Sequence, residues 1–199
     1  MITRKEMTRM LLKEGLLSCL ANNSFETVTV TSLCKASGIT RSTFYLHYSN
    51  IMEIVDDLVD DAIAYSKPGM VDNNNLQTIA NTLSAASNSV ALREAYDSIF
   101  DRLPLCQRII RHKKYLPLFL DEQISEYVLQ RIIRREKDRQ GLVMAEALGI
   151  SFDVGVSIFI FLVHGLYAVN KQYKWSQSDE WLEAQKIIFK LVYRGLQSR

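Results

Sequence analysis

The chain has 199 residues, of which 48% are hydrophobic and 23% charged, and its formal net charge is +2. A chain of this length and apolar content can bury a core, so an extended disordered protein is excluded. The weak positive charge excludes a heavily basic, histone-like binder, and any affinity for nucleic acid must come from a local patch.

The first predicted element is an amphipathic helix over residues 4–21. Apolar residues such as Leu12 and Leu16 recur at helical spacing, opposite a basic face. The same segment lacks the uninterrupted apolar run of a signal peptide because Lys13 and Glu14 break it. We therefore expect a cytoplasmic protein.

Two short helices are predicted next, over residues 30–37 and 41–47. Thr29 and Thr40 each stand in the N-cap position before one of them, and Gly38 ends the first. Glycine readily takes the positive φ that a sharp turn between helices needs. Such a pair forms a helix-turn-helix, whose second helix can enter the DNA major groove. The spacing is also typical of a plain helical hairpin in a bundle, so spacing alone leaves both interpretations open.

The second short helix is expected to have a packed face and a polar face. Phe44 and Tyr48 are four residues apart and can pack against neighbouring helices. The other positions carry donors and acceptors, and arginine can address guanine while hydroxyls can reach bases or phosphates. These candidate residues are Arg41, Ser42, Thr43, Tyr45 and His47. Residues 1–50 hold six Lys or Arg against three Asp or Glu, which gives this part a local positive excess.

A fourth helix, over residues 51–66, has one apolar stripe and paired aspartates elsewhere. We expect its acidic face to be solvated and to point away from DNA. The segment KPGMVDNNN follows and is the clearest linker in the chain. It divides the sequence into a predicted domain over residues 1–66 and a second over residues 75–199.

The larger half is predicted to consist of helices alone, which makes the fold class all-α. Pro104 is expected to kink or divide one helix, and Pro117 to begin another. The apolar run over residues 154–169 is short for a membrane span and contains polar residues, so we expect a buried helix and no membrane partner. The expected helices lie near 75–89, 92–112, 117–139, 151–173 and 178–197.

Nothing in the sequence indicates an enzyme. The histidines, at positions 47, 112 and 164, do not form HExxH or a similar spacing, and no glycine-rich phosphate loop follows a strand. The cysteines lie far apart, outside any CxxC or Cys/His cluster: Cys19, Cys34 and Cys106. We therefore expect no catalytic residues, no metal and no cofactor.

The stretch TVTSLCKASGITRSTFYLHYSN, residues 29–50, resembles the N-terminal domain of the TetR family of bacterial transcriptional regulators. The likeness lies in a small residue, Gly38, an aliphatic residue, a hydroxyl and an aromatic pair at fixed spacing. It implies a three-helix DNA-binding domain with a connecting helix, followed by a helical bundle that dimerises. The residues that it implies for DNA binding are Thr29, Thr31, Thr40, Arg41, Ser42, Thr43, Tyr45, His47 and Asn50.

Two positions depart from the family's pattern. Ile51 stands where the family usually has a phosphate-holding lysine, and Ser24 stands where it often has glycine. One lost phosphate contact would lower the salt slope of binding by about one unit.

Residues 148–175 are similar to the penultimate helix of a branch of the same family, whose last two helices form the dimer interface. The resemblance implies a homodimer through helices near 151–173 and 178–197, a double-stranded DNA operator, and a small-molecule effector. It implies a repressor whose dimer an inducer releases from DNA, and activation of transcription stays open as the other sign of regulation. The alternative is a helical ligand sensor or protein-interaction module with a weakened DNA-binding head. Candidate pocket residues, which can equally be ordinary core residues, are Phe100, Cys106, Phe119, Tyr127, Phe161, His164 and Tyr167.

Overall fold

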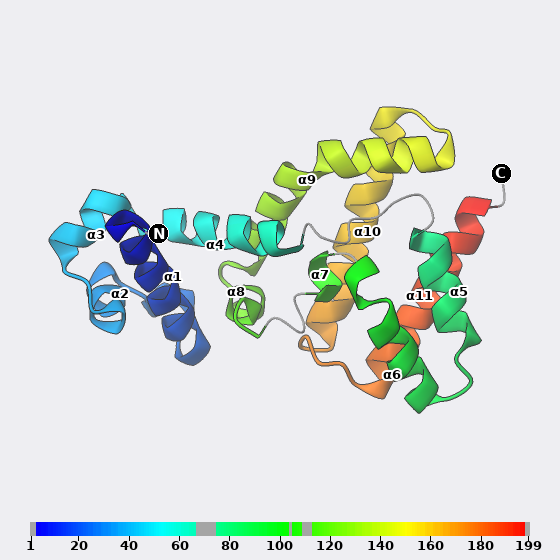
Figure 1. The fold of residues 1–199 in the computed structure, drawn as a ribbon, viewed down its shortest axis with the longest axis horizontal. Coiled ribbons are helices and arrows are strands. Elements are labelled where there is room, and N and C mark those ends of the chain that lie inside the picture. Colours follow the sequence, from blue (N-terminus) through cyan, green and yellow to red (C-terminus); the bar gives the residue numbers. More distant parts are fainter. Residues whose placement is uncertain (1–2, 67–74, 104, 109–112, 198–199) are drawn as a thin grey trace. The chain divides into compact units, whose positions relative to one another are not determined.

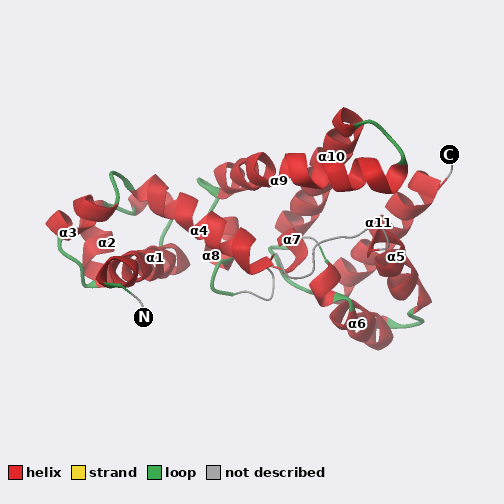
Figure 2. Cartoon of the chain, turned by 45° about the horizontal axis from the view of Figure 1, so that its top comes forward, coloured by secondary structure: helices red, strands yellow, loops and turns green. Residues whose placement is uncertain are grey.

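The computed structural model describes residues 3–66, 75–103, 105–108 and 113–197 (Figure 1). Every regular element in these ranges is a helix and none is a strand (Figure 2), which confirms the all-α class. The chain forms two compact units, one from Met1–Tyr65 with His112–Ile132 and the other from Ser66–Arg111 with Ile133–Arg199.

The first unit is built around helix α1, Arg4–Asn22. A capping box begins this helix, because the Glu6 N–H donates to Thr3 Oγ1 and the Glu6 carboxylate accepts from the Thr3 N–H. The 3₁₀ turn η1, Phe25–Thr27, leads to α2, Val30–Ser37, and α3, Arg41–His47. A Cβ on Gly15 would lie 2.8 Å from the Ser37 Cβ, so this glycine allows α1 and α2 to pack closely.

Helices α4, Ile51–Ser66, α8, Leu116–Leu120, and the start of α9, Ser125–Leu148, complete the first unit. Asp121, directly after α8, accepts a 2.7 Å hydrogen bond from the backbone N–H of Phe25. The division predicted from the sequence treats residues 1–66 and 75–199 as successive domains, whereas this unit also includes residues 112–132. The sequence pattern does not reveal that residues 112–132 belong to the first unit, because this depends on contacts between segments far apart in the chain.

The second unit contains α5, Asn75–Ala85, α6, Ser89–Ser98, the 3₁₀ turn η2, Phe100–Arg102, α7, Leu105–Arg108, the rest of α9, α10, Phe152–Gln172, and α11, Asp179–Gln197. Trp181 on α11 is fully buried and meets Tyr96 of α6 edge to face. Helices α9 and α10 cross closely, since a Cβ on Gly155 would clash with the Gly141 carbonyl oxygen.

Three of the longer predicted helices are divided or shifted in the structure. The helix expected over 75–89 ends at Ala85, because Asn88 caps α6 by accepting from the Ala91 N–H. The helix expected over 92–112 is interrupted after Ser98 by η2, and Pro104 lies outside the described residues. Pro117 does stand at the start of α8, as predicted, but Asp121 separates α8 from α9 by accepting from two following N–H groups.

Candidate nucleic-acid interface

Hydroxyl caps and one glycine define α2 and α3. Thr29 Oγ1 accepts from the Ser32 N–H at 3.1 Å, and Thr40 Oγ1 accepts from the Thr43 N–H at 3.2 Å. Gly38, between the helices, has φ of 67°, a conformation that favours glycine. The predicted caps and turn are therefore confirmed. They fix where α3 begins and which of its side chains face the core.

Helix α3 has a buried face and an exposed face. Phe44 is fully buried and Tyr48, just after the helix, is nearly so. Arg41 and Ser42 are exposed, and Tyr45 is 53% exposed. Thr43 and His47 are half-buried, and Thr29 and Thr31 are exposed at the start of α2. The structure thus brings the predicted donors and acceptors together on one short pair of helices.

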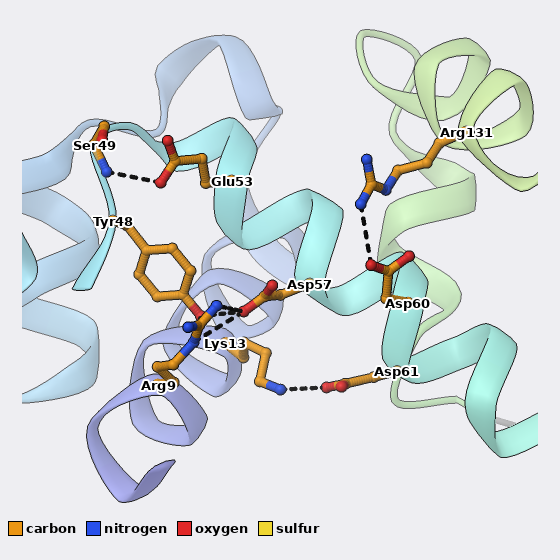
Figure 3. A network of polar contacts seen from close by, with 9 residues as sticks. All are labelled: Arg9, Lys13, Tyr48, Ser49, Glu53, Asp57, Asp60, Asp61 and Arg131. Carbon is orange, nitrogen blue, oxygen red and sulfur yellow. Dashed lines mark hydrogen bonds and ion pairs between the residues drawn. The ribbon is translucent and has the colours of Figure 1, made fainter. Parts of the chain in front are cut away.

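Helix α1 holds α4 and the end of α3 through the polar contacts drawn in Figure 3. Arg9 binds the Asp57 carboxylate at 2.6 Å, and the Tyr48 hydroxyl donates to the same carboxylate at 2.6 Å. Burial and this hydrogen bond raise the pKa of Tyr48, while the bond to Asp57 raises the pKa of Arg9. The sequence predicts that Tyr48 packs against neighbouring helices, but it does not reveal the hydrogen bond of its hydroxyl.

The aspartates of α4 bind neighbouring helices on two sides. Lys13 of α1 pairs with Asp61 at 2.5 Å. Arg131 of α9 lies 3.1 Å from carboxylate oxygens of both Asp56 and Asp60. The expectation of a solvated acidic face was therefore wrong. The missed signal is complementary spacing, since basic residues four apart on α1 face acidic residues four apart on α4.

Helix α4 begins with a closed cap. Asn50 Oδ1 accepts from the Glu53 N–H at 3.2 Å, and the Glu53 carboxylate accepts from the Ser49 N–H at 2.9 Å. Ile51 is half-buried in the first turn. Glu53 thus places negative charge at the end of the helix where a phosphate would otherwise bind. Asn50 is one of the predicted DNA-binding residues, and its side-chain oxygen is used for capping instead.

The other departure from the family's pattern has no structural cost. Ser24 has φ of −68° and ψ of 145°, an extended conformation that any residue adopts. Glycine is therefore not needed after α1.

The predicted pocket residues lie in different surroundings. Phe119 belongs to the core of the first unit, and the Tyr127 hydroxyl donates to Asp56 at 2.6 Å in the same unit. In the second unit Tyr167 is buried against the Trp175 ring. Phe100 is half-buried, while Phe161 and His164 are exposed. The Cys106 side chain lies outside those that the structure describes.

A buried polar chain in the second unit was not predicted. The Tyr96 hydroxyl donates to Gln107 Oε1 at 3.1 Å, and Gln107 Nε2 donates to Gln185 Oε1 at 2.9 Å. Beside it the Trp181 indole N–H donates to Asn170 Oδ1 at 3.0 Å. In the sequence, the only sign of these buried hydrogen bonds is that amide side chains occupy inward positions of apolar helices. These bonds satisfy most of the buried side-chain amides and fix the positions of the helices along one another.

The described residues also bear on two other functions, metal binding and membrane insertion. They contain no group of three or more His, Cys, Asp or Glu side chains that could hold a metal ion. One described helix, α10, is long and apolar enough to cross a membrane by length and composition alone. Several of its apolar side chains are exposed, including Phe161 at 73%.

Comparison of the chain with protein-family models, with curated proteins and with solved structures gives no significant match. The resemblance to the TetR family therefore depends on the sequence motifs alone. What α2 and α3 can do must be inferred from their own side chains.

Proposed function

We propose that the protein is a sequence-specific DNA-binding transcriptional regulator of the TetR type rather than an enzyme, and that α2 and α3 are its helix-turn-helix. The observation that carries the proposal is the division of α3 into two faces. Phe44 and Tyr48 hold the helix on its unit, while Arg41, Ser42 and Tyr45 remain exposed. A recognition helix needs this arrangement, because its reading side chains must stay free of the core.

Each exposed residue has a suitable role on a DNA duplex. Arg41 can donate to guanine O6 and N7, and the hydroxyls of Ser42 and Thr43 can reach bases or phosphates. Tyr45 and His47 are suited to the phosphate backbone, as are Thr29 and Thr31 at the start of α2. Exposed basic side chains elsewhere in the first 50 residues add favourable charge: Arg4, Lys5 and Lys35.

A cytoplasmic homodimer through α10 and α11 is part of the same proposal. Two copies related by a twofold axis would present two α3 helices to two half-sites. Support comes from exposed apolar side chains on both helices, with Phe161 at 73% and Leu191 at 66%. By analogy with the TetR family, the dimer represses transcription and a small molecule in the C-terminal half releases it.

A fluorescence-anisotropy titration at two salt concentrations tests the proposal. The labelled duplexes are the DNA upstream of the protein's own gene and a random sequence of equal length. We expect tighter binding to the upstream DNA, and an affinity that falls with salt as phosphate contacts are screened. Equal affinity for both duplexes would contradict the regulator and favour the alternative, a helical ligand sensor or interaction module with a weakened DNA-binding head.

Two adjacent residues of α3 provide matched variants. Tyr45→Ala should weaken DNA binding and leave helicity unchanged, because that ring is largely exposed. Phe44→Ala should lower the free energy of unfolding by about 3–5 kcal/mol, since that ring is fully buried. Circular dichroism and thermal melting measure both effects. Equal destabilisation by the two substitutions would show that the faces of α3 are wrongly assigned.

A further inference from the structure

The most exposed large apolar side chain in the described part of the chain is Leu46, on α3, at 82%. It lies one helical turn after Ser42 and Thr43, so it shares their side of the helix. Tyr45, its neighbour, is also exposed. A helix of seven residues therefore presents two large apolar groups to solvent beside its hydroxyls and Arg41.

The fold of the first unit does not use Leu46. Phe44 on α3 and Tyr48 directly after it supply the buried side chains, and the helix is held by the Thr40 cap and the Tyr48 hydroxyl. A leucine left in water forgoes the favourable free energy of burial, which a complex that covers it would recover. The position of Leu46 on the proposed recognition helix indicates which complex that is.

The major groove offers one apolar group on its base edges, the C5 methyl of thymine. A leucine side chain cannot hydrogen-bond to a phosphate or to the polar edge of guanine, cytosine or adenine. We propose that Leu46 contacts a thymine methyl in each half-site and thereby selects a T·A pair there. This inference rests on the proposed DNA-binding function. It adds Leu46 to the predicted DNA contacts, which were chosen as hydrogen-bond donors and acceptors and therefore do not include a leucine.

The experiment replaces thymine by uracil, which lacks only the methyl. A duplex selected by the protein from random sequence serves as the probe, and each thymine is changed to deoxyuridine in turn. We expect one position per half-site at which the wild-type protein binds about fourfold more weakly, the effect of about one buried methyl group. The Leu46→Ala variant should bind the thymine and uracil duplexes equally at that position.

Val90→Ala is the matched control, because Val90 is an apolar side chain exposed to 68% on α6 of the second unit. It should keep the full preference for thymine. Leu46→Ala should keep the wild-type circular dichroism spectrum, since so exposed a side chain contributes little to the core.

Two outcomes overturn the inference and leave the proposed function standing. In one, no uracil substitution weakens binding by the wild-type protein. In the other, the change from thymine to uracil weakens binding of the Leu46→Ala variant as much as it weakens binding of the wild type. The methyl contact would then belong to another side chain. If selection yields no duplex that binds more tightly than random DNA, the proposed function fails and this inference fails with it.

Discussion

At the scale of single residues, Tyr48 connects three helices of the first unit. Its ring lies beside Phe44 of α3, its hydroxyl donates to Asp57 of α4, and Arg9 of α1 lies 4.9 Å over the ring. If only the bulk of the ring mattered at this position, phenylalanine would serve equally well. The hydroxyl adds a polar contact that determines where α3 ends relative to α1 and α4.

Tyr48→Phe should therefore lower the free energy of unfolding by about 1–2 kcal/mol, because a nearly buried hydrogen bond to a carboxylate is lost. Urea denaturation followed by circular dichroism measures the change. Tyr45→Phe is the control, since that side chain is largely exposed, and it should leave the midpoint unchanged. Identical midpoints for the wild type and both variants would show that the Tyr48 hydroxyl is not structural.

The same residue predicts a loss of stability at alkaline pH. The pKa of Tyr48 is raised in the folded protein, by burial and by the bond to Asp57, whereas the unfolded chain releases this proton near pH 10, roughly the value of free tyrosine. The contribution to stability is complete below the unfolded pKa and is lost as pH rises through the folded pKa. The advantage of the wild type over Tyr48→Phe in urea should thus shrink between pH 8 and pH 11. An advantage that does not change with pH would contradict this prediction.

At the scale of elements, the crossing of α9 and α10 depends on two glycines. Gly155→Ala should destabilise the protein by about 3 kcal/mol, because the added methyl would meet the Gly141 carbonyl oxygen. Gly165→Ala on the same helix is the control. A Cβ there meets nothing within 4 Å, and alanine favours the helix by up to about 1 kcal/mol. Thermal melting compares the two, and similar melting temperatures would contradict the close crossing.

The short elements could be predicted from the sequence because their signals are local. Thr29, Gly38 and Thr40 act on neighbours within three residues, so the bounds of α2 and α3 follow from the residues themselves. The break between α8 and α9 at Asp121 could not be predicted. The residues on both sides have a helical pattern, and the side-chain hydrogen bonds of Asp121 that interrupt the helix leave no periodic signal in the sequence. The pairing of Arg9 with Asp57 was missed for another reason, since 48 residues separate the partners.

At the scale of the whole molecule, the second unit leaves apolar side chains uncovered. The exposed residues on its last two helices include Val154 and Phe161 on α10, and Ile187 and Leu191 on α11. The uncovered apolar surface of a monomer is usually small, and larger patches mark sites of association. We expect the proposed homodimer to bury these side chains.

Light scattering coupled to gel filtration should accordingly give twice the chain mass of 22.8 kDa. Combining Phe161→Glu with Leu191→Glu should give a folded monomer, because charges would be buried in the interface. Val90→Glu, another exposed apolar position, should remain a dimer. A wild-type monomer in solution would contradict the interface, and wild-type protein that partitions into detergent would favour a membrane role for α10.

The segments that make up the first unit limit how this unit could be transferred to another protein. A chimera that joins residues 1–66 to a foreign C-terminal half would keep α1–α4 but lose Asp121, Tyr127 and Arg131. The Phe25 N–H and the carboxylates of α4 would then lack these partners. A graft that preserves the head must carry residues 112–132 as well, and its second junction falls inside α9, between Ile132 and Ile133. Recombination between related chains at a single crossover after α4 would therefore leave the first unit without these contacts and destabilise it, however well α3 itself were kept.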